Sequence, residues 1–292
     1  MTQTQLSKLI NQQRPILIIG STGTLGSDLV QYFKQKLGEE KVIGTDSSEL
    51  DITDPVMLLE KLELLRPSLV INASGYTDVD LAEKEREKAY NLNVIGLSNL
   101  VSLCNSMGVK LVHFSSDYVF DGTLNRPLTE DDTPFPVKPN FYAETKLLGE
   151  IEVLKYSENL VLRLQWLYGK TKNRFSILAD IEGFSPFSDQ YGTPQWTMDV
   201  AKIVFELLEK NAMGLFHFSY DDYGTREDVY KFIKSELELV LKIDPKPISE
   251  ANLAARRPQF CILSNKKICQ FLGKQGLGLW RDSLREFLRQ NL

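Results

Sequence analysis

Residues 15–26 read PILIIGSTGTLG, an apolar run that ends in glycines at positions 20, 23 and 26. The aliphatic residues before the first glycine predict a short buried strand. After the glycines, apolar side chains recur at helical spacing, at Leu25, Leu29, Val30 and Phe33. The pattern therefore predicts a strand, a tight turn and a helix in immediate succession.

Glycines at this spacing suit a turn that holds a pyrophosphate. Gly20 permits the tight turn, Gly23 lets the backbone approach the ligand, and Gly26 lets the helix pack closely on the strand. The positive end of the helix then faces the anion. A glycine triad alone also occurs in turns without a ligand, so the strand before it and the helix after it carry the prediction. We expect a dinucleotide to contact Gly20, Thr22, Gly23, Thr24, Leu25 and Gly26.

An acidic residue follows the second predicted strand, residues 41–45. This residue is Asp46, which lies 20 positions after Gly26. A carboxylate at this distance accepts hydrogen bonds from the adenosine ribose and favours NAD over NADP. A loop aspartate or a helix cap is the alternative interpretation. We expect NADPH or NADH as the cofactor, with Asp51 and Ile52 bordering its adenine.

Strands and helices alternate through most of the chain. Further strands are predicted by apolar runs at residues 67–72, 110–114, 160–164 and 214–218. Such alternation is typical of an α/β protein with a doubly wound, Rossmann-type parallel sheet, which binds its ligand at the carboxyl ends of the strands. Ala73, Ser74 and Gly75 follow one of these runs, and their small side chains let a cofactor cross the strand end.

The alternation does not resume from Thr225 onward. We expect an NAD(P)-binding domain over residues 1–166, to which residues 192–220 return, and a smaller C-terminal substrate-binding domain over residues 167–292. The connection at residues 118–139 is rich in Pro, Asp and Thr. It is too long for a simple link, which suggests a border or a lid for the substrate.

Proton-transfer chemistry is predicted around the fourth strand and the helix after it. The strand of residues 110–114 is expected to give way to Ser116, and the next helix carries Tyr142 and, four residues later, Lys146. Residues four apart share a helix face. A positive charge lowers the pKa of a phenol from its usual value of about 10, and such a proton donor suits carbonyl reduction. A Tyr-x-x-x-Lys spacing also occurs by chance. Here it follows the glycine turn and the strand-end serine along the chain, and this order of motifs favours a catalytic role.

The composition is that of an ordinary globular protein of 292 residues, with a net charge of −5. This charge argues against nucleic acid and anionic membranes as partners. Cys104, Cys261 and Cys269 lack a CxxC spacing, so we expect neither a disulfide framework nor a metal site. His113 and His217 stand in apolar runs and are expected in the core.

Residues 1–14 lack an apolar signal-peptide core, and no run approaches the length of about 18 apolar residues that would span a membrane. We therefore expect a reduced cytoplasmic protein that acts on a small molecule. A homodimer is possible.

Together these motifs resemble the extended short-chain dehydrogenases/reductases. The run SSDYVFDG at residues 115–122, followed by the pair of Tyr142 and Lys146, is most similar to the dTDP-4-dehydrorhamnose reductase family. The segments NAS at residues 72–74 and RP at residues 257–258 fit the same pattern. The resemblance implies NAD(P)H-dependent reduction of the C4 keto group of a nucleotide-linked 6-deoxy sugar, most simply dTDP-4-dehydro-L-rhamnose to dTDP-L-rhamnose.

The resemblance also implies a role for each site residue. Tyr142 would protonate the C4 oxygen, while Lys146 would hold the nicotinamide ribose and lower the pKa of the phenol. Ser116 would hydrogen-bond the sugar oxygen. On the substrate side the resemblance adds Asp117 and Trp166 beside the sugar and Arg257 facing the diphosphate.

Three positions depart from the family pattern. Leu164 and Gln165 stand where Thr-Ser is usual, and Cys261 stands where a serine is expected. These differences lie near residues implied on the substrate side, so they bear on which sugar is bound.

Two alternatives remain beside the reductase. A non-catalytic NADP-binding subunit would resemble the regulatory β subunit of methionine adenosyltransferase, which carries a run similar to SSDYVFDG. A scaffold does not need Ser116, Tyr142 and Lys146 together, so the complete set favours the enzyme. Epimerisation or dehydration is the least favoured interpretation, because only Asp117 follows Ser116 where dehydratases usually add an acidic pair.

Overall fold

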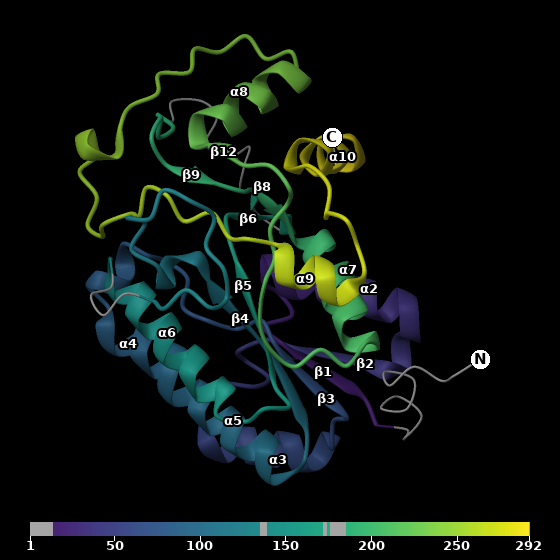
Figure 1. Ribbon diagram of the computed structural model, residues 1–292. Helices are drawn as coiled ribbons and strands as arrows, with labels where there is room; N and C mark the ends of the chain where they lie inside the picture. The colour runs from purple at the N-terminus through teal and green to yellow at the C-terminus, as the bar shows by residue number, and fades with distance from the viewer. Residues whose placement is uncertain (1–13, 135–138, 172–173, 176–184, 292) are drawn as a thin grey trace.

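A six-stranded parallel sheet forms the centre of the molecule (Figure 1). The structure, a computed structural model, describes residues 14–134, 139–171, 174–175 and 185–291. The strand order is β11-β5-β4-β3-β1-β2. The bounds are Ile16–Ile19 for β1, Val42–Thr45 for β2, Leu69–Asn72 for β3, Lys110–Ser116 for β4, Leu160–Leu164 for β5 and Gly214–His217 for β11. The predicted doubly wound α/β sheet is therefore confirmed.

Alternate residues of the strands face two separate cores. In β1, Ile16 and Ile18 pack against α2 (Thr24–Leu37) and α7 (Thr197–Glu209), while Leu17 and Ile19 face the opposite layer. That layer consists of α3 (Pro55–Leu65), α5 (Leu97–Ser106) and α6 (Phe141–Leu154) (Figure 1). A strand buried on both faces is apolar throughout, which explains why the run ILII shows no polar alternation.

The chain between β3 and β4 is not one continuous α-helix. A short 3-10 turn, Leu81–Glu83, precedes α4 (Arg86–Tyr90), and a π-helical turn, Asn91–Gly96, joins α4 to α5. Gly96 packs closely on Ile52: a Cβ atom at position 96 would lie 2.9 Å from the Ile52 side chain. Such π-helical turns are rare in proteins as a whole, but those that occur are often found at functional sites.

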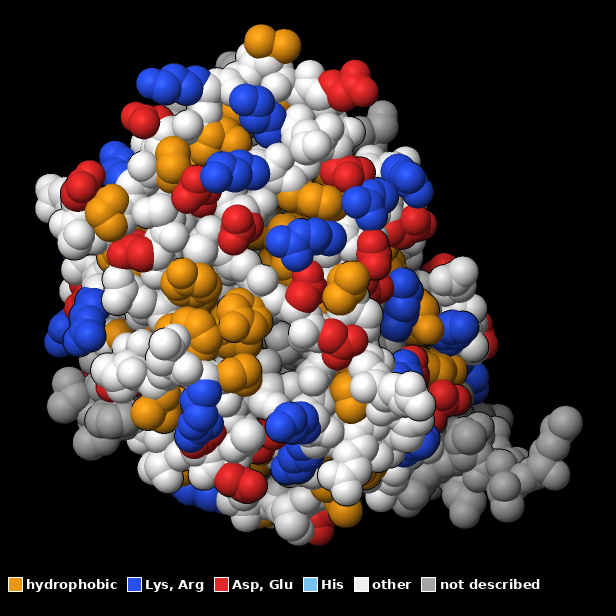
Figure 2. All heavy atoms as spheres, turned by 45° about the horizontal axis from the view of Figure 1, so that its top comes forward, with side chains coloured by type: hydrophobic (Ala, Val, Ile, Leu, Met, Phe, Trp, Pro, Cys, Tyr) orange, Lys and Arg blue, Asp and Glu red, His pale blue; other side chains and the backbone are white. Residues whose placement is uncertain are grey.

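The other described residues form three small two-stranded sheets and three further α-helices, beside short 3-10 turns. The strand pairs are β6 (Leu167–Tyr168) with β10 (Gln195–Trp196), β9 (Tyr191–Gly192) with β12 (Gly224–Thr225), and β7 (Lys170–Thr171) with β8 (Arg174–Phe175). The helices are α8 (Arg226–Glu236), α9 (Lys266–Leu272) and α10 (Trp280–Asn291). Seen from the α8 side, the surface carries basic and acidic side chains in mixed order (Figure 2).

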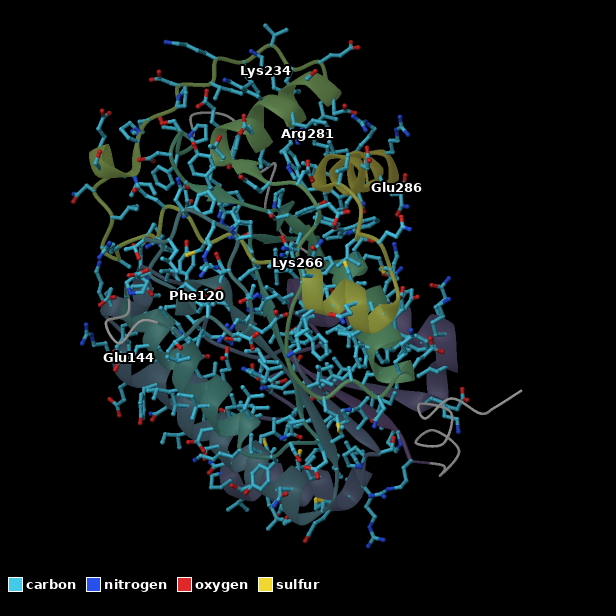
Figure 3. All side chains as sticks on the ribbon, viewed as in Figure 1. Phe120, Glu144, Lys234, Lys266, Arg281 and Glu286 are labelled. Carbon is cyan, nitrogen blue, oxygen red and sulfur yellow. The ribbon has the colours of Figure 1, made fainter. Side chains whose placement is uncertain are left out.

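Side chains of the C-terminal segments reach into the core beside the sheet. Trp280 and Phe287 of α10 belong to the same buried cluster as α7 and β1, and the Phe287 ring meets Tyr168 edge to face. Phe120, which follows β4, is buried with Leu128 and Cys261 (Figure 3). The C-terminal helices α9 and α10 thus share a core with the sheet, and the domain bounds stay a prediction.

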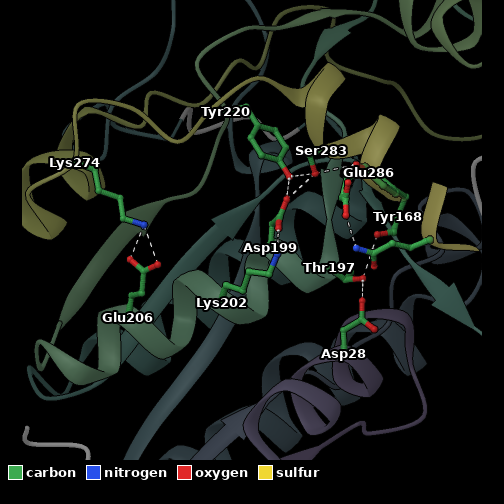
Figure 4. A network of polar contacts seen from close by, with 11 residues as sticks. Asp28, Tyr168, Thr197, Asp199, Lys202, Glu206, Tyr220, Lys274, Ser283 and Glu286 are labelled. Atoms are coloured by element: carbon green, nitrogen blue, oxygen red, sulfur yellow. Dashed lines mark hydrogen bonds and ion pairs between the residues drawn. The ribbon is translucent and has the colours of Figure 1, made fainter. Parts of the chain in front are cut away.

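A polar network joins α10 to α7 and α7 to α2 (Figure 4). The Tyr220 and Ser283 hydroxyls both donate to Asp199 Oδ2, at 2.8 and 2.6 Å. The Thr197 hydroxyl donates to Asp28 Oδ2 at 2.5 Å. Burial raises the pKa of Asp28, and the hydrogen bond from Thr197 lowers it in part.

The two histidines and the three cysteines lie in the interior of the protein. His113 and His217 are 3% and 0% exposed, so their placement in the core is confirmed. The three cysteines are buried free thiols. Among the described residues, no helix is both long enough and apolar enough to cross a bilayer, and no cluster of potential metal-binding side chains is present.

An ion pair is buried between α6 and β5. The Arg163 guanidinium donates to both Glu150 oxygens, at 2.6 and 2.9 Å, and the two side chains are 2% and 3% exposed. Arg163 Nη1 also lies 3.1 Å from His217 Nε2 on β11. The pair therefore connects α6, which carries Tyr142, to two strands of the sheet.

We predict that Glu150→Gln lowers the free energy of unfolding by about 3–5 kcal/mol, because it leaves the Arg163 charge buried without a counterion. Urea unfolding checks this value. Glu152→Gln is the matched control, since Glu152 pairs with the exposed Lys155 on the same helix and should cost less than about 1 kcal/mol. Equal losses in the two variants would contradict the prediction.

Candidate active site

A cavity of about 470 Å³ opens at the carboxyl ends of the strands. Its wall comes from the glycine turn, the end of β3, the end of β4, helix α6 and the end of β5. A second hollow of about 280 Å³ continues from it past Asp51 and Ile52. The two hollows share Gly23, Ala73, Ser74 and Gly75, so they form one groove across the strand ends.

The glycine turn leaves the first amide groups of α2 facing this groove. Gly23 is the N-cap of α2 and no side chain caps the helix, so its N–H groups keep their capacity for an anion. Gly20 has a φ of +80°, and a Cβ atom on it would lie 2.8 Å from the Ser74 nitrogen. A Cβ atom on Gly26 would overlap the Gly20 carbonyl. The turn therefore fits the pyrophosphate of a dinucleotide, as expected for an NAD(P)-binding cradle.

Strand β4 is longer than predicted. It continues through Ser115 and Ser116, which pair with Arg163 and Leu164 of β5. The expected end at Phe114 is wrong because hydrogen bonding to the neighbouring strand outweighs the local preference of serine for turns. Ser116 is consequently held by the sheet at the wall of the cavity rather than by a loop.

The structure brings Ser116, Tyr142 and Lys146 together on that wall. Asn140 caps α6 by accepting a hydrogen bond from the Ala143 nitrogen at 2.8 Å, and this cap starts the helix that carries the pair. Lys146 Nζ donates to the Phe114 carbonyl at 2.7 Å and lies 3.5 Å from His113 Nε2. Both α6 side chains are buried.

Burial dominates the electrostatics of these groups. It raises the pKa of Tyr142, which a hydrogen bond with Ser116 lowers only in part. The expected lowering of this pKa by Lys146 is therefore wrong for this structure, in which the ammonium donates to a carbonyl. Burial also lowers the pKa of Lys146 to about 8. Burial and the Lys146 charge hold the pKa of His113 well below its usual range, so the imidazole is neutral.

Two asparagines position this site. Asn93, in the π-helical turn, accepts from the Tyr76 nitrogen at 2.8 Å and donates to the Thr145 hydroxyl at 3.0 Å. It thus joins the loop after β3 to the catalytic helix. Asn72 accepts from the Ser74 hydroxyl at 2.6 Å and lies 3.3 Å from His113 Nδ1. The sequence pattern marks Asn72 at a strand end, but nothing in it distinguishes Asn93 from its helical neighbours.

Asp117 and Gln165 also line the cavity, beside Ser116. Asp117 accepts from Ser116 Oγ at 3.0 Å and from Gln165 Nε2 at 2.8 Å, and burial raises its pKa to about 7. Gln165 also donates to the Cys261 carbonyl at 2.9 Å and accepts from the Thr193 nitrogen at 2.8 Å. Gln165 and Cys261, two of the positions that depart from the family pattern, are therefore in contact with each other.

Trp166 lines the same cavity with an unusual backbone. Its φ is +41°, in the left-handed region that residues other than glycine rarely adopt. The Gln195 nitrogen donates to its carbonyl at 3.1 Å, and Gly192 lies against the indole so closely that a Cβ atom there would overlap the ring. The neighbouring strands β9 and β10 thus hold this conformation.

Three predicted site residues do not line the cavities: Gly26, which packs on the Gly20 carbonyl, and also Arg257 and Asp46. Arg257 forms an ion pair with Asp80 at 2.5 Å and donates to the Ala255 carbonyl at 2.7 Å. Asp46 accepts from the Ser48 nitrogen and hydroxyl at 2.8 and 2.6 Å, while Ser47 lines the smaller hollow. Their roles toward the diphosphate and the adenosine ribose stay predictions.

Comparisons with known proteins agree with this geometry. The family model described as RmlD substrate binding domain matches residues 14–292. The spore coat polysaccharide biosynthesis protein SpsK of Bacillus subtilis is 30% identical over 94% of this chain and 97% of that protein. The dTDP-4-dehydrorhamnose reductase of Aggregatibacter actinomycetemcomitans is 31% identical over 92% of this chain and 97% of that protein.

A solved structure is similar over nearly the whole length. The dTDP-4-dehydrorhamnose reductase of Bacillus anthracis, in complex with NADP, has a TM-score of 0.88 at 28% identity, covering 95% of this chain and 99% of that one. Sequence, family model and fold therefore converge over more than nine tenths of the chain. The chain belongs to the dTDP-4-dehydrorhamnose reductase family of extended short-chain dehydrogenases/reductases.

Proposed function

We propose that this protein uses NADPH or NADH to reduce the C4 keto group of a nucleotide-linked 6-deoxy sugar, most simply dTDP-4-dehydro-L-rhamnose to dTDP-L-rhamnose. The observation that carries the proposal is the meeting of Ser116, Tyr142 and Lys146 on one cavity wall beside the glycine turn. Family membership supports it, as does the NADP bound to the similar Bacillus anthracis enzyme.

Each of these side chains has a separate role in carbonyl reduction. A bound NAD(P)H supplies the hydride for C4. Tyr142 donates the proton to the C4 oxygen, and its raised pKa means that this proton is present at neutral pH. Ser116 turns its single hydroxyl proton from Asp117 to the same oxygen and orients it. Lys146 holds the nicotinamide ribose through its ammonium.

The complete set of reacting side chains favours an enzyme over the non-catalytic subunit. A scaffold has no use for a buried lysine, and burying its charge is unfavourable unless a ligand or a partner group compensates. Relatives at about 30% identity include a spore coat polysaccharide biosynthesis protein as well as dTDP-4-dehydrorhamnose reductases, so the rhamnose derivative is the simplest member of the proposed substrate class. A cytoplasmic location and a homodimer stay predictions.

We predict that Tyr142→Phe lowers kcat for a dTDP-4-dehydro sugar by about 10²- to 10⁴-fold, because it removes the general acid. The affinity for NADPH should change by less than about threefold, since the ring and its packing remain. NADPH oxidation, with the keto sugar generated in place, measures the first quantity, and fluorescence titration measures the second. Tyr168→Phe is the control, because it removes a buried phenol bonded to Ser283, away from the cavity. Wild-type turnover in Tyr142→Phe would refute this assignment of the acid.

We predict that NADPH affinity falls as the pH rises through about 8. The folded pKa of Lys146 is lowered to about 8, so its ammonium is present below this pH and is lost above it. Lys146→Arg should remove the pH dependence, since guanidinium stays charged throughout this range. Fluorescence titrations of NADPH from about pH 7 to 9.5 provide the measurement. A wild-type affinity that stays constant over this range would contradict a ribose-binding role for the ammonium.

A further inference from the structure

Arg226 stacks on Trp166, which lines the cavity, and it lies on an element that the sequence motifs do not mark. It is the first residue of α8, whose start is fixed by a capping box between Thr225 and Asp228. Its guanidinium carbon lies 3.9 Å from the centre of the Trp166 ring. Its Nε donates to Gln190 Oε1 at 3.4 Å, and its backbone nitrogen donates to the Gln190 carbonyl at 3.1 Å. The guanidinium is therefore held against an indole that lines the cavity.

This arginine differs from four others that are wholly or partly buried. The closest parallel is Arg281, which lies 4.3 Å over the ring of Trp280 and has Asp222 at 2.6 Å (Figure 3). Arg163, Arg257 and Arg285 also have carboxylate partners. Within the part of the chain that the structure describes, no carboxylate lies within ion-pair distance of Arg226 and no acceptor is bonded to its two Nη groups. The two Nη groups of Arg226 therefore have no anionic partner among the described residues.

The surroundings of Arg226 make an anion favourable. Burial lowers its pKa, and the charge of Arg257 acts in the same direction, against the effect of Tyr118, Tyr230 and Asp117. Asp117 is the carboxylate on the cavity wall, and its own pKa is raised to about 7. Lys146 adds a further positive charge to the same wall. A bound anion would offset both the desolvation of Arg226 and its repulsion by Arg257.

We propose that Arg226 binds the phosphate groups of the nucleotide-linked substrate and is a specificity-determining residue of this protein. The inference rests on the proposed function. If the keto oxygen lies at Tyr142 and Ser116, the diphosphate on C1 is directed to the opposite side of the pyranose ring, away from C4. Trp166 borders the cavity together with these residues, so the sugar extends along the indole and its phosphates meet the guanidinium stacked there. Arginine suits this task, because its fork donates two parallel hydrogen bonds to one phosphate.

The test measures binding of nucleoside diphosphates and needs no turnover. The full-length protein is saturated with NADP⁺, so that the glycine turn is occupied, and is titrated calorimetrically with dTDP, UDP and thymidine. Arg226→Met keeps an unbranched apolar chain for the indole but removes the charge. We expect it to weaken dTDP and UDP binding by about 10- to 100-fold, the range of a lost charge-assisted contact, and to leave thymidine within about twofold.

Two further variants keep the test decisive. Arg281→Met removes the other arginine stacked on a tryptophan and should leave all three affinities unchanged. Arg226→Lys keeps the charge but not the fork, so it should weaken dTDP by about tenfold even if Arg226→Met does not fold. The proposal is overturned if these Arg226 variants bind dTDP as tightly as the wild type does. It is also overturned if the affinity for thymidine falls by the same factor as the affinity for dTDP, or if the wild type binds neither dTDP nor UDP. Retained reduction of the keto sugar with unchanged dTDP affinity would overturn this inference alone, whereas Arg226-dependent binding without reduction would overturn the proposed function alone.

Discussion

Parallel pairing of all six central strands is the constraint on which the site depends. Because these strands run in one direction, their carboxyl ends meet along one edge of the sheet. The register sets Asn72 beside His113 and Ser116 beside Leu164, so polar side chains from separate strands meet at this edge of the sheet. A shift of one residue would turn each of these side chains to the other face. Tight packing of Gly26 on Gly20 then sets the first helix over the same edge.

A second consequence of this architecture is electrostatic. Parallel sheets are covered on both faces, so groups at the strand ends lie in a poorly solvated environment. Burial shifts each of them toward its neutral form: the pKa values of Tyr142 and Asp117 rise, and those of Lys146 and His113 fall. The site therefore contains a protonated acid and a lysine whose charge is easily lost. Groups whose pKa values are displaced in this way by a fold are frequent in catalytic sites.

Local patterns in the sequence predict most of the fold, since a strand or a helix core depends mainly on nearby residues. The runs at ILII and LVLRL, and the helix with Tyr142 and Lys146, fall where their patterns place them. The local patterns miss the features that distant segments decide. Ser115 and Ser116 extend β4 because β5 pairs with them. Arg257 turns to Asp80, 177 residues away in the chain, and the left-handed backbone of Trp166 depends on β9 and β10. Contacts between residues so far apart along the chain leave no periodic signal in the sequence.

The two walls of the groove have different origins along the chain. The wall at the glycine turn is built by continuous sequence from β1 to α6, whereas the wall at Trp166 is assembled from β5, the segment at Gln190, the start of α8 and the segment at Cys261. Gln165 and Gln190 join the pieces of this second wall through buried hydrogen bonds. Substitutions in the late segments can therefore accumulate during evolution without disturbing the hydride chemistry. The same separation makes the protein suited to recombination, with the early segment retained and the late ones exchanged among relatives to obtain reductases for other sugars.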